Sequence, residues 1–246
     1  MAAIRKPLQG IWNVIRFNWH FYLLSIGFVF GILIFNRLLP ELYHIFGNTM
    51  VAFLVIMTTI SILVTFYVYD LSDLYKLAWL DEFDTQKNLK IANINAGFDE
   101  TSVLLVDKFS NARLSVFDFY DPSKHTEISI KRARKAYPPF PNTQQIDTSV
   151  IPIMDADIIF LILSAHEIRN EEERNIFFNE LRKTLNSEGR IIVVEHLRNL
   201  PNFLAYNIGA FHFISKKSWY RTFENSSLVV LREVMITPFI TVFTLK

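Results

Sequence analysis

The chain has 246 residues, of which 51% are hydrophobic and 20% charged, and its formal net charge is +1 at pH 7. A charge this close to zero argues against nucleic acid or another polyanion as a partner. Because the chain has no cysteine, it contains no disulfide, no thiolate nucleophile and no cysteine-ligated metal.

Two long stretches near the N-terminus contain no Asp, Glu, Lys or Arg, namely residues 17–36 and 45–69. About 20 apolar residues are enough to cross the hydrocarbon core of a bilayer. Trp12 and Trp19 lie around the start of the first stretch, as is typical of residues at a membrane interface. We therefore expect two transmembrane helices, over residues 17–36 and 48–69. The alternative is a pair of buried core helices.

The charges around these stretches predict their orientation. Arg5, Lys6 and Arg16 precede the first one, whereas the connection around Arg37 and Glu41 has almost no net charge. The positive-inside rule keeps the N-terminus in the cytosol, and a two-span hairpin returns the chain there. A cleaved signal peptide is not expected, because no small-residue cleavage site follows the apolar stretch. The sequence thus predicts a multi-pass membrane protein with a cytoplasmic domain.

A charged, amphipathic connector over residues 70–88 leaves the second span. We expect residues 1–84 to form a membrane anchor and residues 85–246 to form one domain. About 160 residues are enough to bury a core of their own, so this domain should fold without the anchor.

Beyond the connector, four short apolar runs each end in polar residues. The runs are Leu89–Ile94, Leu114–Phe117, Ile158–Leu163 and Ile191–Val194. Helical patterns lie between most of them, which predicts a mostly parallel sheet covered on both faces. Ligands of such sheets bind beyond the carboxyl ends of the strands, where these polar residues fall.

Three helices and a terminal hairpin complete the pattern. The helices are expected at Glu100–Ser110, Thr126–Tyr137 and Glu171–Leu185. Asn170 should cap the third helix, because Glu173 follows three residues later as in a capping box. The basic cluster 131–135 of the second helix is expected to be a solvated face, with anionic lipid headgroups as the alternative. Two apolar runs around Thr237-Pro238 predict an antiparallel pair of strands.

Five segments in order resemble motifs of the class I S-adenosylmethionine-dependent methyltransferases. Gly97 is the one glycine that remains of the family's glycine-rich loop, within Asn93–Asp99. The other four segments are Ala112–Asp118, Asp147–Pro152, Ala156–Ile159 and Phe177–Ile191. The resemblance covers about residues 86–246. It implies an α/β fold with a Rossmann-like seven-stranded methyltransferase sheet whose last strand is antiparallel. A transmembrane helical hairpin would precede this sheet.

The resemblance also implies S-adenosyl-L-methionine as the cofactor. Asp118 would accept hydrogen bonds from the ribose hydroxyls, with Asp121 as its rival, and Asp147 would accept from the adenine amino group. Asp99 in a glycine position would repel the methionine carboxylate, so we expect it to cap the following helix instead. The full set of expected cofactor-binding residues is Asn93, Asn95, Ala96, Gly97, Asp118, Asp147, Thr148 and Ser164.

Two histidines lie where an acceptor would meet the methyl donor. His166 follows the predicted fourth strand and His196 ends the fifth. Imidazole titrates near neutral pH, so either could act as a general base. A purely structural role is the alternative for both. No metal is expected, because the spacing of these histidines with Glu167 and Glu195 is not a recognised metal pattern.

The segment 202–213 is rich in aromatic residues and should form an apolar pocket or membrane-facing lip, with core packing as the alternative. Together these features predict a membrane-tethered methyltransferase for a lipophilic small molecule, such as a lipid, a quinone-like compound or an aromatic polyketide. Asn95 and Asp99 motivate the alternative of a non-catalytic methyltransferase-fold subunit that binds a partner. A nicotinamide-dependent oxidoreductase is disfavoured by the missing Gly-x-Gly-x-x-Gly. The sequence does not predict the oligomeric state.

Overall fold

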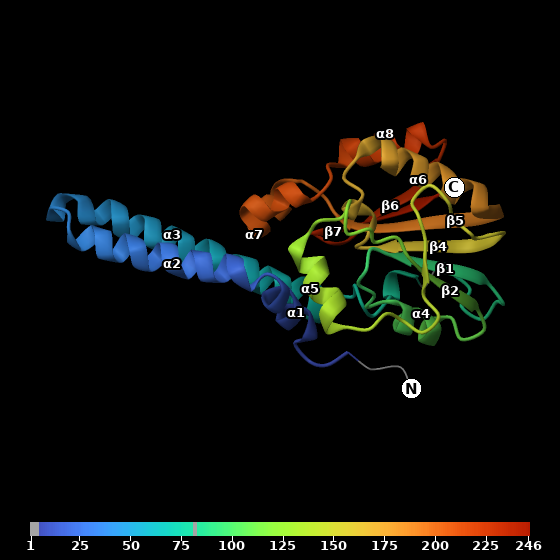
Figure 1. Ribbon diagram of the computed structural model, residues 1–246, viewed down its shortest axis with the longest axis horizontal. Helices are drawn as coiled ribbons and strands as arrows, with labels where there is room; N and C mark the ends of the chain where they lie inside the picture. The colour runs from blue at the N-terminus through green and yellow to red at the C-terminus, as the bar shows by residue number, and fades with distance from the viewer. Residues whose placement is uncertain (1–4, 81–82) are drawn as a thin grey trace.

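A seven-stranded sheet forms the body of the protein, and a helical hairpin projects from one end of it (Figure 1). The computed structural model describes residues 5–80 and 83–246. The strands are β1 (Lys90–Asn95), β2 (Arg113–Asp118), β3 (Gln144–Gln145), β4 (Ala156–Ile162), β5 (Leu185–His196), β6 (Val230–Thr237) and β7 (Ile240–Leu245). Their order is β3-β2-β1-β4-β5-β7-β6, and β7 is antiparallel to both of its neighbours. The predicted fold, including its antiparallel last strand, is confirmed.

The register of the parallel strands aligns their polar ends. Asn95 at the end of β1 lies opposite Asp118 at the end of β2, and Asp118 lies opposite Gln145 of β3. The apolar residues before these ends are buried on both faces of the sheet, which explains why each strand forms a continuous apolar run. The polar residues therefore meet at one edge of the sheet.

One face of the sheet is covered by α6 (Glu171–Thr184) and α8 (Lys216–Asn225). Phe178 of α6 packs against Trp219 and Phe223 of α8, with ring centroids 5.9 and 5.5 Å apart. The Asn170 side chain accepts a hydrogen bond from the backbone N–H of Glu173 at 2.9 Å, so the predicted cap of α6 is confirmed.

The opposite face is covered by α4 (Ser102–Lys108) and by the segment that leaves the hairpin. This segment includes η1 (Tyr67–Leu71) and η2 (Ala78–Leu80). Val68 and Leu80 are completely buried and Leu74 is 1% exposed, all in one cluster with the sheet. A sheet face needs an apolar cover, and here the expected connector supplies it. The expected boundary between residues 84 and 85 therefore cuts through a packed core. Residues 81–82 of the connector lie outside the described residues.

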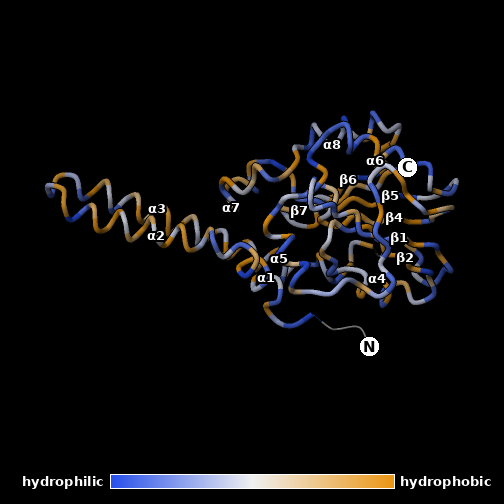
Figure 2. The backbone as a smooth tube through the Cα atoms, in the orientation of Figure 1, coloured by the Kyte–Doolittle hydropathy of each residue, from blue (hydrophilic) through white to orange (hydrophobic). Residues whose placement is uncertain are grey.

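The hairpin consists of α2 (Trp19–Arg37) and α3 (Glu41–Phe66), which run antiparallel (Figures 1 and 2). Both helices are long and apolar enough to cross a membrane. In the most apolar part of α2, only 6% of the residues are buried. In the most apolar part of the helix Glu41–Leu71, which continues from α3 into η1, 11% are buried. Exposure on this scale does not fit the alternative of buried core helices. These bounds differ by a few residues from the expected spans over 17–36 and 48–69.

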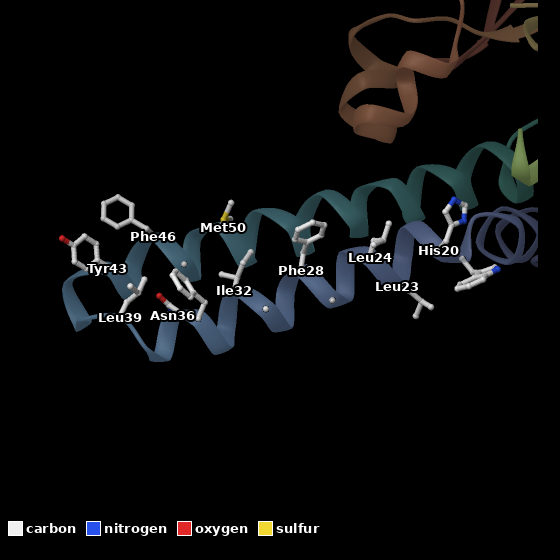
Figure 3. Close-up of a pocket in the computed structure, with 15 residues that line it drawn as sticks. His20, Leu23, Leu24, Phe28, Ile32, Asn36, Leu39, Tyr43, Phe46 and Met50 are labelled. Carbon is white, nitrogen blue, oxygen red and sulfur yellow. The ribbon is translucent and has the colours of Figure 1, made fainter. Parts of the chain in front are cut away.

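Polar contacts hold the two hairpin helices together. The Ser25 and Thr58 hydroxyls lie 3.1 Å apart, and Asn36 donates to the Asn48 side chain at 3.1 Å. Hydrogen bonds of this kind stabilise helix pairs in an apolar environment. A groove of about 1060 Å³ runs along the hairpin and is lined almost entirely by apolar side chains, including Phe28 (Figure 3).

Candidate cofactor crevice and histidine cluster

The loop after β1 makes a sharp turn at Gly97, whose φ is +89°. Asn95 holds this turn with both ends of its amide. Its Nδ2 donates to the carbonyl of Phe117 at 3.1 Å, and its Oδ1 accepts from the backbone N–H of Gly97 at 3.0 Å. Side chains are strained at this φ, so the position favours glycine, and a Cβ here would also lie 2.7 Å from Nη1 of the flexible Arg134 side chain. Asn95 thus preserves the turn that the missing glycine would make.

Asp118 ends β2 and is only 4% exposed. Its Oδ1 accepts from the backbone N–H of Tyr120 at 2.8 Å, and its Oδ2 accepts a short hydrogen bond from Arg134. Arg134 comes from α5 (Ile128–Ala136), and its guanidinium lies over the Tyr120 ring, 4.6 Å from the centroid. The guanidinium therefore occupies the carboxylate oxygen that a ribose hydroxyl would use.

Asp147 and Thr148 border a pocket of about 740 Å³ that Tyr120 and Arg134 also line. Asp147 uses Oδ1 in its own turn, where it accepts from the backbone N–H of Ser149 at 2.8 Å. Gly97 and Asp118 lie against Arg134, and Asp147 lines the pocket that Arg134 and Tyr120 also line. The pocket lining includes neither Gly97 nor Asp118. We call this place, with Arg134 and Tyr120 between the three segments, the crevice. That the three segments bind one ligand stays a prediction.

Three other expected cofactor residues make internal contacts. Asn93 donates to Thr101 Oγ1 at 3.0 Å and to Ser102 Oγ at 2.8 Å, which fixes the start of α4. Ser164 donates to the carbonyl of Ile94 at 2.8 Å, and Ala96 is buried in the core. These contacts favour supporting roles, because the side chains hold the strand ends in place.

Asp99 divides its two oxygens between different environments. Oδ1 accepts from the backbone N–H groups of Thr101 and Ser102, each at 2.9 Å, at the start of α4. The helix begins at Ser102 and its N-cap residue is Thr101, so Asp99 is not the expected cap but supports the start of the helix from two residues upstream of it. Oδ2 is buried and has no hydrogen-bond partner among the described residues. A buried acceptor without a partner is costly, which marks this oxygen as one that a ligand donor could satisfy.

Helix α1 (Gln9–Phe17) lies across the crevice loop and against α5 (Figure 1). Glu100 receives hydrogen bonds from Arg5 at 3.0 Å and from Asn13 at 3.0 Å. Phe17 packs on Phe98 with ring centroids 5.6 Å apart. No sequence pattern predicted α1 as a part of this site.

Arg134 was also missed, because the cluster 131–135 was expected to be a solvated face. The outer residues Lys131 and Lys135 are indeed exposed. Arg132 instead donates to the carbonyl of Phe17, and Arg134 donates to Asp118. One feature of the sequence could have indicated this packing, because small Ala133 lies between Arg132 and Arg134. Ala133 is 1% exposed and lets α5 approach the body of the protein.

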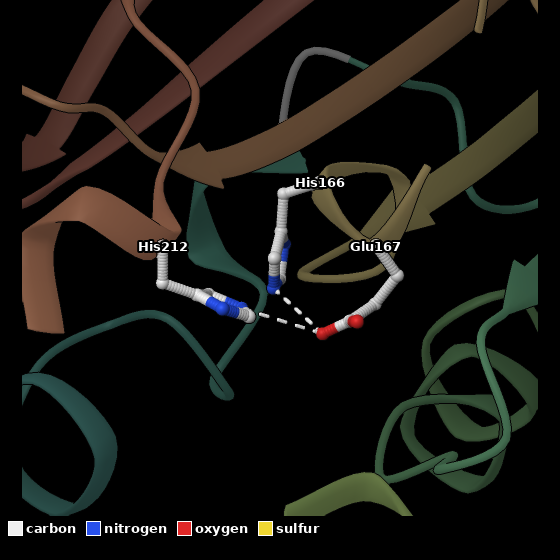
Figure 4. A group of neighbouring side chains, drawn as sticks. All are labelled: His166, Glu167 and His212. Carbon is white, nitrogen blue, oxygen red and sulfur yellow. Dashed lines mark ion pairs between the residues drawn. The ribbon is translucent and has the colours of Figure 1, made fainter. Parts of the chain in front are cut away.

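A second polar group lies where β4 and β5 end, around η3 (Ala165–Glu167) and η4 (Asn207–His212) (Figure 4). His166 Nδ1 lies 2.6 Å from Glu195 Oε2, and His166 Nε2 lies 3.3 Å from Glu167 Oε1. His212 Nε2 lies 3.4 Å from the same Glu167 oxygen. We call His166, Glu167 and His212 the histidine cluster.

Burial lowers the pKa of His166, but the carboxylates of Glu195 and Glu167 outweigh it and raise this pKa to about 10. The ring therefore carries a proton on each nitrogen at neutral pH and donates to the two carboxylates. A general base must be unprotonated. The expected role of His166 as a base stays a prediction, and it requires the carboxylates to be neutralised first.

His196 lies in a different environment. Its Nε2 is 2.9 Å from the Tyr69 hydroxyl and its Nδ1 is 3.1 Å from Asn202 Oδ1. The ring stacks on Phe213 with centroids 4.7 Å apart. Both ring nitrogens are thus used to join η1 and β5 to α7 (Leu200–Tyr206). This arrangement favours the structural alternative for His196.

The His196 ring should make stability depend on pH. Burial lowers its pKa to about 3, whereas an unfolded histidine titrates near 6.5. A lowered pKa stabilises the fold above about pH 6.5, and this contribution is lost as the pH falls toward 3. We expect the melting temperature of the full chain in detergent to fall between pH 7 and pH 5. His196→Gln should have a lower melting temperature at pH 7 and a smaller fall in melting temperature between pH 7 and pH 5. His44→Gln is the control and should behave as the wild type. Equal falls in wild type and His196→Gln would contradict the assignment.

No family model matches this chain, and no curated protein sequence matches it. Solved structures do resemble it. A SAM-dependent methyltransferase from Aquifex aeolicus matches with a TM-score of 0.52 and 15% identity, over 71% of this chain and 89% of the other. The chain has the class I methyltransferase fold.

Two larger methyltransferases have the same core. RosA from Streptomyces davawensis, an N,N-8-amino-8-demethyl-D-riboflavin dimethyltransferase, matches with a TM-score of 0.52 and 10% identity, over 76% of this chain and 56% of RosA. The mitomycin 7-O-methyltransferase MmcR matches with a TM-score of 0.50 and 13% identity, over 71% of this chain and 53% of MmcR. The chain thus spans little more than half the length of these two proteins. Identities this low concern the fold alone.

Proposed function

We propose that this chain is a membrane-tethered, S-adenosylmethionine-dependent methyltransferase for a lipophilic small molecule, such as a lipid, a quinone-like compound or an aromatic polyketide. The main support is that Gly97, Asp118 and Asp147 each follow the carboxyl end of a parallel strand, with Arg134 and Tyr120 lying between them. In open α/β sheets this is where nucleotide-like ligands bind.

The residues of the crevice carry the chemical groups that S-adenosylmethionine would require. Asp118 would hold the ribose hydroxyls, and Asp147 with Thr148 would hold the adenine. The backbone at Gly97 would pass along the methionine chain, and the unpartnered Oδ2 of Asp99 would accept from its ammonium group. The cofactor supplies an activated methyl group. The protein has to align the acceptor with it and exclude water.

The ion pair between Arg134 and Asp118 must open for the ribose to bind. The Arg134 side chain is 36% exposed, whereas that of Asp118 is 6% exposed, so the guanidinium can move into solvent while the carboxylate stays buried. The ribose hydroxyls would then satisfy the buried carboxylate. We expect Arg134→Ala to bind S-adenosylmethionine more tightly by isothermal titration, because the ribose no longer has to displace the guanidinium. Arg132→Ala on the same helix is the matched control and should leave affinity unchanged. Weaker binding by Arg134→Ala would mean that Arg134 is part of the cofactor site.

The proposal of a lipophilic acceptor rests on segment 202–213, which includes η4. Leu204, Ile208 and Phe211 are 57%, 76% and 63% exposed, and α7 lies beside α3 (Figure 1). These apolar side chains would form a lip at the membrane surface. The next residue, His212, reaches the histidine cluster. The lip and the polar cluster are therefore adjacent, as transfer of an acceptor from the bilayer requires.

The cytoplasmic location of the domain is part of the same proposal. Arg5, Lys6 and Arg16 lie at the end of the hairpin that joins the body, and the turn at Leu38–Pro40 lies at the far end (Figure 1). Basic residues remain on the cytoplasmic side of a membrane.

One observation favours the alternative of a non-catalytic binding subunit. Arg134 already satisfies Asp118 and lies over Gly97, as a permanent substitute for the cofactor would. In that case neither the wild type nor Arg134→Ala would bind S-adenosylmethionine.

Mass spectrometry tests the activity directly. The full chain is reconstituted in vesicles of a native lipid extract and incubated with S-adenosylmethionine that carries an isotopically labelled methyl group. We expect a labelled lipophilic product, and no product with Asp118→Ala. Bound cofactor without any labelled lipid would disprove the lipophilic acceptor, and the absence of cofactor binding would disprove the enzyme.

A further inference from the structure

The histidine cluster has the spacing of a metal-binding site. Nε2 of His166 and Nε2 of His212 lie 3.3 and 3.4 Å from the same oxygen of Glu167, and the three atoms lie within 4.8 Å of one another. A tetrahedral zinc ion with bonds of about 2.0–2.1 Å has ligand atoms about 3.3 Å apart. Two of the three separations therefore match this geometry without any rearrangement.

Exposure within the cluster increases from Glu167 to His212. The Glu167 side chain is 4% exposed, that of His166 is 11% exposed and that of His212 is 25% exposed. Figure 4 shows the three side chains converging from η3 and from the η4 segment. Three protein ligands with one accessible side are typical of a catalytic metal site, which keeps a position for water or substrate.

Each histidine is oriented by a second carboxylate. His166 Nδ1 lies 2.6 Å from Glu195, and His212 Nδ1 lies 3.2 Å from Glu127. The contact with Glu195 holds the proton of His166 on Nδ1 and leaves its Nε2 as the ligand atom, as in the carboxylate–histidine–metal arrangement. The Glu195 carboxylate has no exposed surface, so this orientation is firmly held. His212 Nδ1 is also in short contact with the Arg169 guanidinium, which lies 3.3 Å from His212 Nε2. Arg169 therefore has to turn away before His212 can bind an ion.

The local charge also calls for a cation. Glu127, Glu167 and Glu195 surround the two imidazoles, and Arg169 pairs with Glu127 at 3.0 Å. With neutral imidazoles, as metal binding requires, one guanidinium leaves two negative charges uncompensated. A divalent ion would balance them.

From this geometry we propose that His166, Glu167 and His212 bind one divalent transition-metal ion, with Zn²⁺ as the best fit. The two histidines and one carboxylate form a ligand set that zinc enzymes use. The ion would bind an acceptor oxygen at the open position and favour its deprotonation. That role rests on the proposed function, whereas metal binding itself does not.

The test uses the full chain in detergent, stripped of metal with a chelator. Isothermal titration with Zn²⁺ should show one equivalent bound. Co²⁺ bound to the wild type should give the intense visible absorption of a tetrahedral site, and this measurement does not depend on any substitution. His212→Gln should lose both signals. Glu195→Gln should bind about 10- to 100-fold more weakly, because it keeps the ligands but changes their orientation. His44→Gln at the far turn of the hairpin is the control and should bind as the wild type.

Three results would overturn the proposal. The first is the absence of saturable one-to-one binding in the wild type, and the second is an octahedral Co²⁺ spectrum of the wild type. The third is unchanged binding by His212→Gln, which would identify the ion as adventitious. Titration of S-adenosylmethionine on the same preparations separates the two proposals. Zinc binding without cofactor binding would sustain the metal site and disprove the enzyme.

Discussion

Deleting residues 1–84 is expected to unfold the body of the protein. Val68, Leu74, Leu77 and Leu80 are at most 2% exposed and belong to the core cluster on one face of the sheet. Burial of such a side chain contributes about 1.5–3 kcal/mol, so four contribute roughly 6–12 kcal/mol. The total free energy of unfolding of a domain is about 5–15 kcal/mol. The deletion therefore removes an amount comparable with the whole stability.

A matched variant separates the membrane helices from this core. Replacing residues 20–62 by a short Gly/Ser linker keeps α1 and the segment that covers the sheet, because α1 and the end of α3 lie in contact. We expect this variant to be soluble without detergent and to melt cooperatively, whereas the 1–84 deletion aggregates. Calorimetry and circular dichroism measure both. A native-like melting transition in the 1–84 deletion would show that residues 64–80 are dispensable.

Asp118→Ala is expected to abolish binding of S-adenosylmethionine. Its carboxylate would accept from both ribose hydroxyls, and hydrogen bonds to charged groups contribute about 1.5–3 kcal/mol each. Loss of two such bonds corresponds to about 3–6 kcal/mol, or more than about 100-fold in affinity. Isothermal titration of the full chain measures this loss.

Asp121→Ala is the control for the ribose assignment. The Asp121 carboxylate accepts from the backbone N–H and the hydroxyl of Ser123, at 2.8 and 2.7 Å, in an exposed turn. We expect its affinity for S-adenosylmethionine to match that of the wild type. Asp118→Asn preserves the shape of the buried side chain, so a loss in both Asp118 variants is not explained by unfolding. Loss of binding in Asp121→Ala alone would assign the ribose to the rival residue.

The sheet could be predicted because buried parallel strands have an unambiguous pattern. Each of β1, β2, β4 and β5 appears in the sequence as a short apolar run that ends in polar residues, and the parallel register then aligns those ends. The cap of α6 was also predictable, because the contact between Asn170 and Glu173 is local in the chain. Patterns within a few residues were sufficient for both.

Contacts between distant segments could not be predicted in the same way. The direction of the Asn93 side chain toward Thr101 depends on where α4 begins. Arg134 reaches Asp118 only because α5 lies over the crevice, and a basic helix alone is equally typical of a solvated face. His212 meets Glu167 through the fold of η4, which no short motif encodes. Packing decides these contacts, and composition does not reveal it.

Hydrogen–deuterium exchange with and without S-adenosylmethionine tests the central claim most directly. The full chain in detergent is compared at saturating cofactor. We expect simultaneous protection of peptides that cover residues 93–99, 117–121 and 145–149, because one adenosyl group would contact all three. The strand β6 at the far edge of the sheet should exchange at an unchanged rate. Protection of only one of the three segments, or of none, would contradict a single cofactor crevice at the ends of these strands.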